Sequence, residues 1–138
     1  KPRLVAALGA RYHTSAEPAL LRAADVVVEA TGAARIVLDA MTCLRPNGIL
    51  CLTGIAAGRR EETIDANALN RFLVLENNVV FGTVNANRAH YAAAADALAQ
   101  AERSWLEGIV TRRVPLDAWE TAYRPDAGDV KTVVDFRA

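Results

Sequence analysis

Three short segments place a hydroxyl or amide side chain beside a glycine, each directly after an apolar run. The segments are Ala30-Thr31-Gly32, Thr53-Gly54-Ile55 and Gly82-Thr83-Val84-Asn85. A glycine lets the backbone come close to a ligand, and a neighbouring hydroxyl or amide can donate or accept a hydrogen bond. One such segment alone is more typical of an ordinary turn, but three together favour a ligand-binding site. The candidate binding residues are Thr31, Gly32, Thr53, Gly54, Ile55, Thr83, Val84 and Asn85.

Asn85 is the strongest individual candidate. Its neutral amide both donates and accepts hydrogen bonds, which suits an amide group or a sugar hydroxyl. The alternative is a structural role as the cap of a helix that begins near Asn87. The sequence leaves both interpretations open.

The other reactive side chains form no recognisable catalytic or metal-binding set. His13 and His90 have no partner at metal-ligand spacing. Asp25 and Glu29 flank one apolar run, but the sequence does not say whether they act together. No Ser/His/Asp or Cys/His arrangement is recognisable. We therefore assign no catalytic residue and no metal ligand to this chain.

Composition indicates a globular domain. Of the 138 residues, 52% are hydrophobic and 23% are charged, and 16 basic residues balance 16 acidic ones, so we expect no nucleic-acid partner. The apolar runs are too short to cross a bilayer, and Lys1-Pro2-Arg3 does not resemble a signal peptide. Cys43 and Cys51 lie among apolar neighbours and are expected to be reduced core residues. We expect a cytoplasmic protein without membrane contact.

Alternating strands and helices must position the three segments. The expected strands cover residues 25–30, 49–53 and 79–82, and the expected helices cover 33–44, 67–75 and 87–101. The β-branched run at 25–30 favours a strand covered on both faces, and short connections favour a parallel sheet. A loop of small residues, Gly54 to Gly58, follows the second strand. Ligands bind outside the carboxyl ends of such strands, where the three segments lie.

The two ends of the chain follow other patterns. Near the start we expect a helix over 2–8 that ends at Gly9, a short strand over 11–13, and a helix over 18–23 with Ser15 as a cap. Near the end we expect strands over 109–114 and 130–136 on either side of a helix over 116–123. Both strands alternate in polarity, which indicates half-exposed strands of another sheet or a subunit edge.

The phosphate-binding turn of a dinucleotide site is missing from this pattern. No Gly-x-Gly-x-x-Gly occurs between a strand and a helix, although the elements that normally follow one are present. We therefore predict an α/β fold, a partial Rossmann-like doubly wound parallel sheet lacking its first βαβ phosphate-binding unit.

Several segments resemble the C-terminal, nucleotide-binding region of archaeal-type glucose 1-dehydrogenases, which are zinc-dependent members of the medium-chain dehydrogenase/reductase superfamily. The segments are Val27–Gly32, Leu44–Ile49, Phe81–Asn87 with His90-Tyr91, Ile109–Leu116 and Lys131–Val134. The Gly-Thr-Val-Asn stretch within them is the most specific, because the Ala-Thr-Gly strand end occurs across the wider superfamily.

The resemblance implies an NAD(P)-dependent enzyme that oxidises C1 of a sugar to a lactone and transfers hydride to the nicotinamide. It implies that Thr53, Gly54 and Ile55 line the cofactor, that Thr83, Val84 and Asn85 meet its nicotinamide end, that Asn85 also touches the sugar, and that Lys131 reaches the cofactor from the last strand. It further implies NADP or NAD as the cofactor, zinc only in an N-terminal domain outside these residues, and a homo-oligomer.

In this interpretation residues 1–138 are the C-terminal part of the NAD(P)-binding domain, with 109–138 as a candidate return segment to the catalytic domain. The chain by itself is then expected to be inactive and to bind NADP weakly, because the pyrophosphate turn is missing. The alternatives are a non-catalytic α/β nucleotide-binding or oligomerisation module and, with less support, a methyltransferase.

Overall fold

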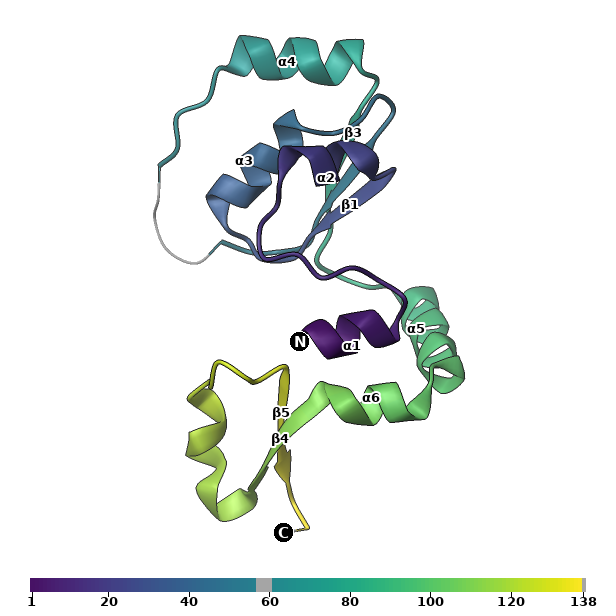
Figure 1. Cartoon of the computed structure of the whole chain (residues 1–138), viewed down its shortest axis with the longest axis vertical. Coiled ribbons are helices and arrows are strands. Elements are labelled where there is room, and N and C mark those ends of the chain that lie inside the picture. The colour runs from purple at the N-terminus through teal and green to yellow at the C-terminus, as the bar shows by residue number, and fades with distance from the viewer. Residues whose placement is uncertain (57–60, 138) are drawn as a thin grey trace. The chain divides into compact units, whose positions relative to one another are not determined.

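The chain divides into two compact units, which we describe separately (Figure 1). The computed structural model describes residues 1–56 and 61–137. Residues 14–86 form one unit, called here the sheet unit, and residues 1–13 with 87–138 form the other, called the terminal unit. The part of the expected small-residue loop formed by Ala57 and Gly58 lies outside the described residues.

Three parallel strands form the centre of the sheet unit. They are β1 (Val26–Glu29), β2 (Ile49–Leu52) and β3 (Val79–Gly82), in the order β1-β2-β3. Glu29 pairs with Leu52 and Leu52 pairs with Gly82, so the three strands end level with one another. The predicted parallel sheet and its three strands are confirmed.

Helices cover one face of this sheet. They are α2 (Pro18–Ala23), α3 (Ala34–Thr42) and α4 (Ala66–Leu75). Helix α3 packs on β1 and β2, and it brings Ala40 and the following Leu44 against Leu50, which is fully buried. Phe72 of α4 packs on the same cluster. Asp65 caps α4 by accepting a 2.9 Å hydrogen bond from the amide of Ala68, so that this helix begins slightly earlier than expected.

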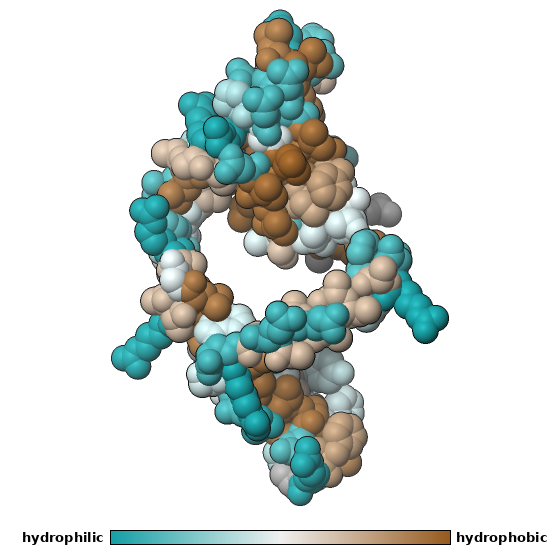
Figure 2. All heavy atoms as spheres, turned by 90° about the vertical axis from the view of Figure 1, so that its right-hand side faces the viewer, coloured by the Kyte–Doolittle hydropathy of each residue, from teal (hydrophilic) through white to brown (hydrophobic). Residues whose placement is uncertain are grey.

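The opposite face of the sheet is open, which corrects the expectation of a strand covered on both sides. Val26 and Val28 are 54% and 61% exposed, whereas Val27 is half-buried. Their exposed neighbours on β2 and β3 are Ile49, Val79 and Phe81. Side chains alternate across a strand, so helices on one side cover only every second residue. Figure 2 shows apolar side chains gathered on the surface of the sheet unit.

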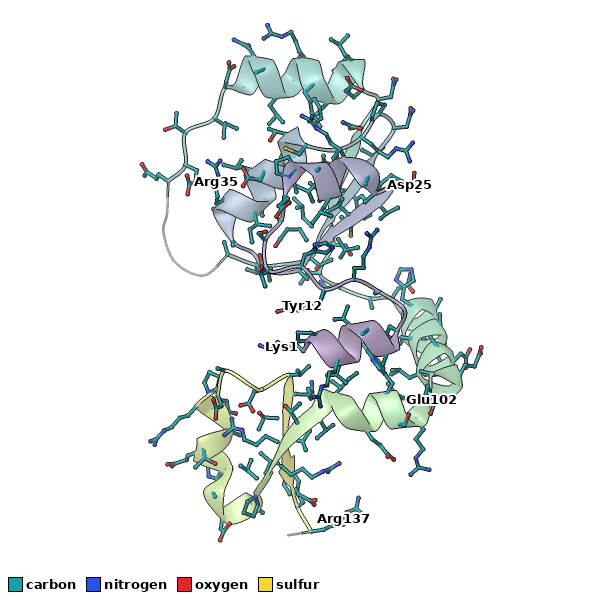
Figure 3. All side chains as sticks on the ribbon, viewed as in Figure 1. Lys1, Tyr12, Asp25, Arg35, Glu102 and Arg137 are labelled. Atoms are coloured by element: carbon teal, nitrogen blue, oxygen red, sulfur yellow. The ribbon has the colours of Figure 1, made fainter. Side chains whose placement is uncertain are left out.

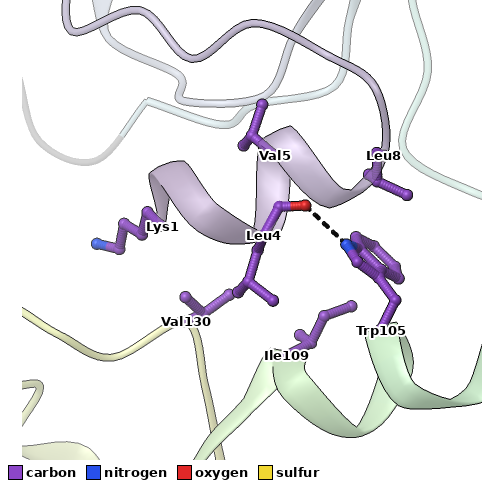
Figure 4. A pocket seen from close by; sticks show the side chains of 7 residues that line it. All are labelled: Lys1, Leu4, Val5, Leu8, Trp105, Ile109 and Val130. Carbon is purple, nitrogen blue, oxygen red and sulfur yellow. Dashed lines mark hydrogen bonds between the residues drawn. The ribbon is translucent and has the colours of Figure 1, made fainter.

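The terminal unit contains a second, separate sheet. Its elements are α1 (Pro2–Ala7), α5 (Arg88–Gln100), α6 (Arg103–Ile109), β4 (Val110–Pro115), η1 (Leu116–Tyr123) and β5 (Lys131–Asp135). Strands β4 and β5 pair in parallel and only with each other among the described residues, which confirms the expectation of another sheet. Trp105 of α6 donates a 2.8 Å hydrogen bond from its indole nitrogen to the carbonyl oxygen of Leu4 on α1 (Figure 4). Gly9 ends α1 with a φ of 71°, as predicted.

Two local predictions near the start of the chain are wrong. Residues 11–13 form no strand, because a strand needs a neighbour to pair with and no described segment pairs with them. Ser15 does not cap α2: the cap position is Glu17, and the Ser15 hydroxyl donates to its carboxylate at 3.3 Å. The helix expected over 116–123 is confirmed, as a 3-10 helix interrupted at Ala118. Helix α5 is exposed along its whole length. None of the described helices is long and apolar enough to cross a membrane.

Candidate functional site

The carboxyl ends of the three parallel strands meet at one edge of the sheet. The amide of Thr53 donates to the carbonyl oxygen of Glu29 at 2.8 Å, and the amide of Thr83 donates to that of Leu52 at 3.0 Å. The first residue after β2 is thereby hydrogen-bonded to the end of β1, and the first residue after β3 is hydrogen-bonded to the end of β2. The segments that follow β1, β2 and β3 therefore lie side by side, as the sequence predicted.

Two of the glycines at this edge touch each other's loops. A Cβ on Gly54 would lie 2.1 Å from the amide nitrogen of Gly32, and a Cβ on Gly32 would lie 2.5 Å from the carbonyl carbon of Ile55. Real Cβ atoms never come so close. Gly32 also has a φ of 66°, a conformation that side chains disfavour. In the structure these glycines allow one loop to approach another. From the sequence we expected them to allow the approach of a ligand.

Gly82 differs from the other two. A Cβ built on it would meet only the carbonyl oxygen of Leu52, at 3.9 Å, which is ordinary contact. The packing of the described chain therefore does not require a glycine here. The space beside Gly82 is available to a flat ligand.

An open groove of about 360 Å³ runs along this edge between the ends of β2 and β3. Its lining residues are Leu52, Thr53, Gly54, Ile55, Gly82, Thr83 and Val84. Five of the predicted binding residues are among them. Ile55 and Val84 are 76% and 70% exposed, so both walls present apolar side chains that nothing in the described chain covers.

The remaining predicted residues lie outside this groove. Thr31 is turned towards Glu29, and Gly32 lines a neighbouring hollow. Asn85 follows directly after the groove and is exposed. Lys131 is the first residue of β5, which belongs to the terminal unit.

The structural role considered for Asn85 is wrong. The cap of α5 is Asn87, whose side-chain oxygen accepts a 2.9 Å hydrogen bond from the amide of His90. Within the described residues, the side chains of Thr83 and Asn85 make no hydrogen bond. Both are therefore free to bind a ligand beside the groove.

Glu29 is the residue at this edge that sequence reasoning missed. It is only 3% exposed, and its carboxylate accepts hydrogen bonds from the Thr31 amide at 2.7 Å, the Thr31 hydroxyl at 2.5 Å and the Gly32 amide at 3.0 Å. The Thr31 hydroxyl, aided by the two amides and opposed by desolvation, lowers the pKa of Glu29. The sequence does carry a signal that could have identified Glu29: it is a charged residue at the end of a β-branched run, directly before Thr31-Gly32.

The chemistry of the groove is that of binding. It offers hydroxyls, backbone amides and apolar walls, and in the described part of the chain no group of three or more histidine, cysteine or acidic residues could hold a metal ion. Thr83 lies in the groove and Asn85 follows directly after it, and both side chains can donate and accept hydrogen bonds.

Comparison with known proteins identifies the family of the chain. Residues 1–136 match the family model described as glucose dehydrogenase C-terminus. The chain is 35% identical to the glucose 1-dehydrogenase of Methanocella arvoryzae, over 100% of this chain and 41% of that protein. It is 39% identical to that of Halobacterium salinarum, over 96% of this chain and 39% of that protein. The chain thus spans about two fifths of the length of these relatives.

Solved structures give the same result. The crystal structure of glucose dehydrogenase from Haloferax mediterranei superposes with a TM-score of 0.82 at 30% identity, covering 96% of this chain and 39% of that one. Its complex with NADP, Zn and gluconolactone also has a TM-score of 0.82, at 31% identity, covering 96% and 38%. The methyltransferase alternative is therefore dropped, and the predicted Rossmann-like fold is confirmed. The chain belongs to the glucose dehydrogenase C-terminus family.

Proposed function

We propose that the chain is the nucleotide-binding part of an NAD(P)-dependent glucose 1-dehydrogenase. The observation that carries this proposal is the groove between the ends of β2 and β3, one wall of which is Gly82, Thr83 and Val84 of the segment that resembles the family. A related enzyme from Haloferax mediterranei binds NADP, Zn and gluconolactone. The whole enzyme would oxidise C1 of the sugar to the lactone.

The residues of the groove would hold the nicotinamide half of NADP or NAD. Ile55 and Val84 would pack against the ring, and the space beside Gly82 would admit it. The free side chains of Thr83 and Asn85 would bind its carboxamide, and Asn85 would also contact a sugar hydroxyl. When bound, the nicotinamide ring supplies the acceptor for the hydride that leaves C1 of the sugar.

The other parts of the proposal rest on the resemblance. The catalytic zinc would belong to a domain outside residues 1–138, and Lys131 would reach the cofactor from β5. Residues 109–138 would return the chain towards the catalytic domain. The enzyme would be a cytoplasmic homo-oligomer. Residues 1–138 alone would be inactive and would bind NADP weakly, and low-micromolar binding in calorimetry would contradict that last expectation.

A charged residue in the groove tests the proposal. In the full-length protein, Val84→Glu places a carboxylate where the ring would lie, and we expect NADP affinity in calorimetry to fall more than about tenfold. Val74→Glu is the matched control, because Val74 is 63% exposed on α4 and outside the groove. Equal NADP affinity of the two variants, or no oxidation of glucose by the unaltered protein, would contradict the proposal. A protein that binds NADP without oxidising any aldose would support the non-catalytic alternative.

A further inference from the structure

One residue holds the ends of two strands. The carboxylate of Glu29 accepts hydrogen bonds from the Thr31 amide, the Thr31 hydroxyl and the Gly32 amide, which follow β1. Its own backbone oxygen accepts hydrogen bonds from the Thr53 amide at 2.8 Å, the Gly54 amide at 3.1 Å and the Thr53 hydroxyl at 3.0 Å, which follow β2. Glu29 therefore fixes both loops from a single point.

The charge of Glu29 has no cationic partner within the described residues. Its carboxylate is buried and is stabilised by amide and hydroxyl donors alone. Asp25, at the other end of the same run (Figure 3), is different: its side chain is 85% exposed and pairs with Arg45. Burying an ion costs free energy, and the hydrogen bonds from Thr31 and Gly32 offset that cost for the carboxylate of Glu29.

The contact between the Gly32 and Gly54 loops links the hydrogen bonds of Glu29 to the groove. A Cβ on Gly32 would lie 2.5 Å from the carbonyl group of Ile55 and 2.8 Å from the amide nitrogen of Ala56, so the two loops are in close backbone contact. Ile55 and Gly54 form one wall of the groove. The other wall begins at Thr83, which is held by Leu52 and not by Glu29. The position of Glu29 relative to β2 thus determines the separation of the two walls.

We propose that Glu29, through Thr31, is a positioning residue that sets the width of the nicotinamide groove. This inference rests on the proposed function of the groove. Loss of the Thr31–Glu29 hydrogen bond lets the turn at Gly32 and the wall at Ile55 move, while the wall at Thr83 stays in place. Cofactor affinity then falls although no residue that touches the cofactor has changed.

Two pairs of variants in the full-length protein test this. Thr31→Val removes the hydroxyl donor with little change of volume, and Thr31→Ser restores it. We expect Thr31→Val to raise the Kd of NADP in calorimetry about tenfold, and Thr31→Ser to return it to within about twofold of the unaltered protein. Glu29→Gln is expected to behave like Thr31→Val, whereas Asp25→Asn, the matched control directly before the same strand, leaves the Kd unchanged.

Hydrogen exchange gives a second readout that needs no cofactor. In Thr31→Val the amides of Thr53 and Gly54 should exchange about tenfold faster, while that of Thr83 keeps its rate. If the unaltered protein binds no NADP but the exchange rates change as expected, the proposed function fails, and what stands is that Glu29 and Thr31 position the loop after β2. The positioning role is overturned if Thr31→Val binds NADP as tightly as the unaltered protein, if Thr31→Ser does not rescue binding, or if exchange accelerates equally at all three amides.

Discussion

The amide nitrogen of Gly32 lies where a side chain on Gly54 would have to begin, 2.1 Å from the position of its Cβ. The loops after β1 and β2 are therefore in direct backbone contact. Because Gly54 also lines the groove between β2 and β3, the same contact that closes the edge of the sheet shapes the proposed cofactor site.

We expect Gly54→Ala to destabilise the fold by about 3 kcal/mol or more, because the new methyl group overlaps the backbone of Thr31 and Gly32 and neither can yield as a side chain would. Urea unfolding measures the change. Gly128→Ala is the control, since a Cβ there meets nothing within 4 Å, and its effect should stay within about 0.5 kcal/mol. Similar losses in both variants would show that the loop contact is not tight.

Gly82→Ala should separate binding from stability. The Cβ has room within the described chain, so the free energy of unfolding should stay the same or rise by up to about 1 kcal/mol. The same methyl group would fill the space proposed for the nicotinamide ring, so the Kd of NADP should rise. Calorimetry and urea unfolding on one preparation give both values. An unchanged Kd would place the ring elsewhere.

Acid should weaken the sheet unit through Glu29. Hydrogen bonds from Thr31 and Gly32 lower the pKa of its carboxyl in the folded state, so ionised Glu29 stabilises the fold fully above the ordinary pKa of a glutamate. That contribution is lost as the pH falls through the lowered pKa, below 4.5. The stability difference between the unaltered protein and Glu29→Gln should therefore be larger at pH 7 than at pH 3. A difference independent of pH would contradict this.

In the terminal unit, Arg112 joins η1 to the segment before β5. Its guanidinium donates to the carbonyl oxygens of Thr121 and Arg124, at 3.1 and 2.9 Å, and pairs with Asp129 at 2.8 Å. The two charged side chains are 26% and 15% exposed, so Arg112→Ala should cost about 2 kcal/mol in urea unfolding. The exposed pair of Arg35 supplies the control: Arg35→Ala should cost less than about 0.5 kcal/mol. Equal losses would show that the Arg112 pair is solvated.

Lys131→Met tests the predicted contact from the terminal unit to the cofactor. Lys131 lies opposite a β-bulge, where the hydroxyl of Thr111 accepts a 2.9 Å hydrogen bond from the amide of Val130. We expect the fold to persist and the Kd of NADP to rise about tenfold at low salt, with a smaller rise at high salt, because ions screen the attraction between an ammonium and the anionic cofactor. Arg137→Met, also exposed on the chain after β5, is the control. Equal Kd values for the two variants would remove Lys131 from the site.

Much of the sheet unit could be predicted from local pattern. The β-branched run at 25–30 and the apolar runs at 49–53 and 79–82 can be buried only as strands, and the short helical segments between them permit only parallel neighbours. Parallel strands in succession end at the same edge, so the sequence also placed Thr53 and Thr83 side by side. Polarity alternation likewise indicated the second sheet, β4-β5.

The contacts within the site were decided by tertiary structure. Gly32 and Gly54 lie 22 positions apart in the chain, and no local pattern says that their backbones touch. Whether Asn85 or Asn87 caps α5 depended on where the helix began, and residues 11–13 form no strand because a ladder needs a partner. Glu29 shows the difference most clearly. Its sequence context marks a carboxylate in an apolar strand, but only folding surrounds that carboxylate with Thr31 and Gly32 while its carbonyl oxygen binds Thr53 and Gly54. Residue type and periodicity are local properties and determined the strands. Hydrogen bonds between distant residues depend on how those strands align, and they determined the site.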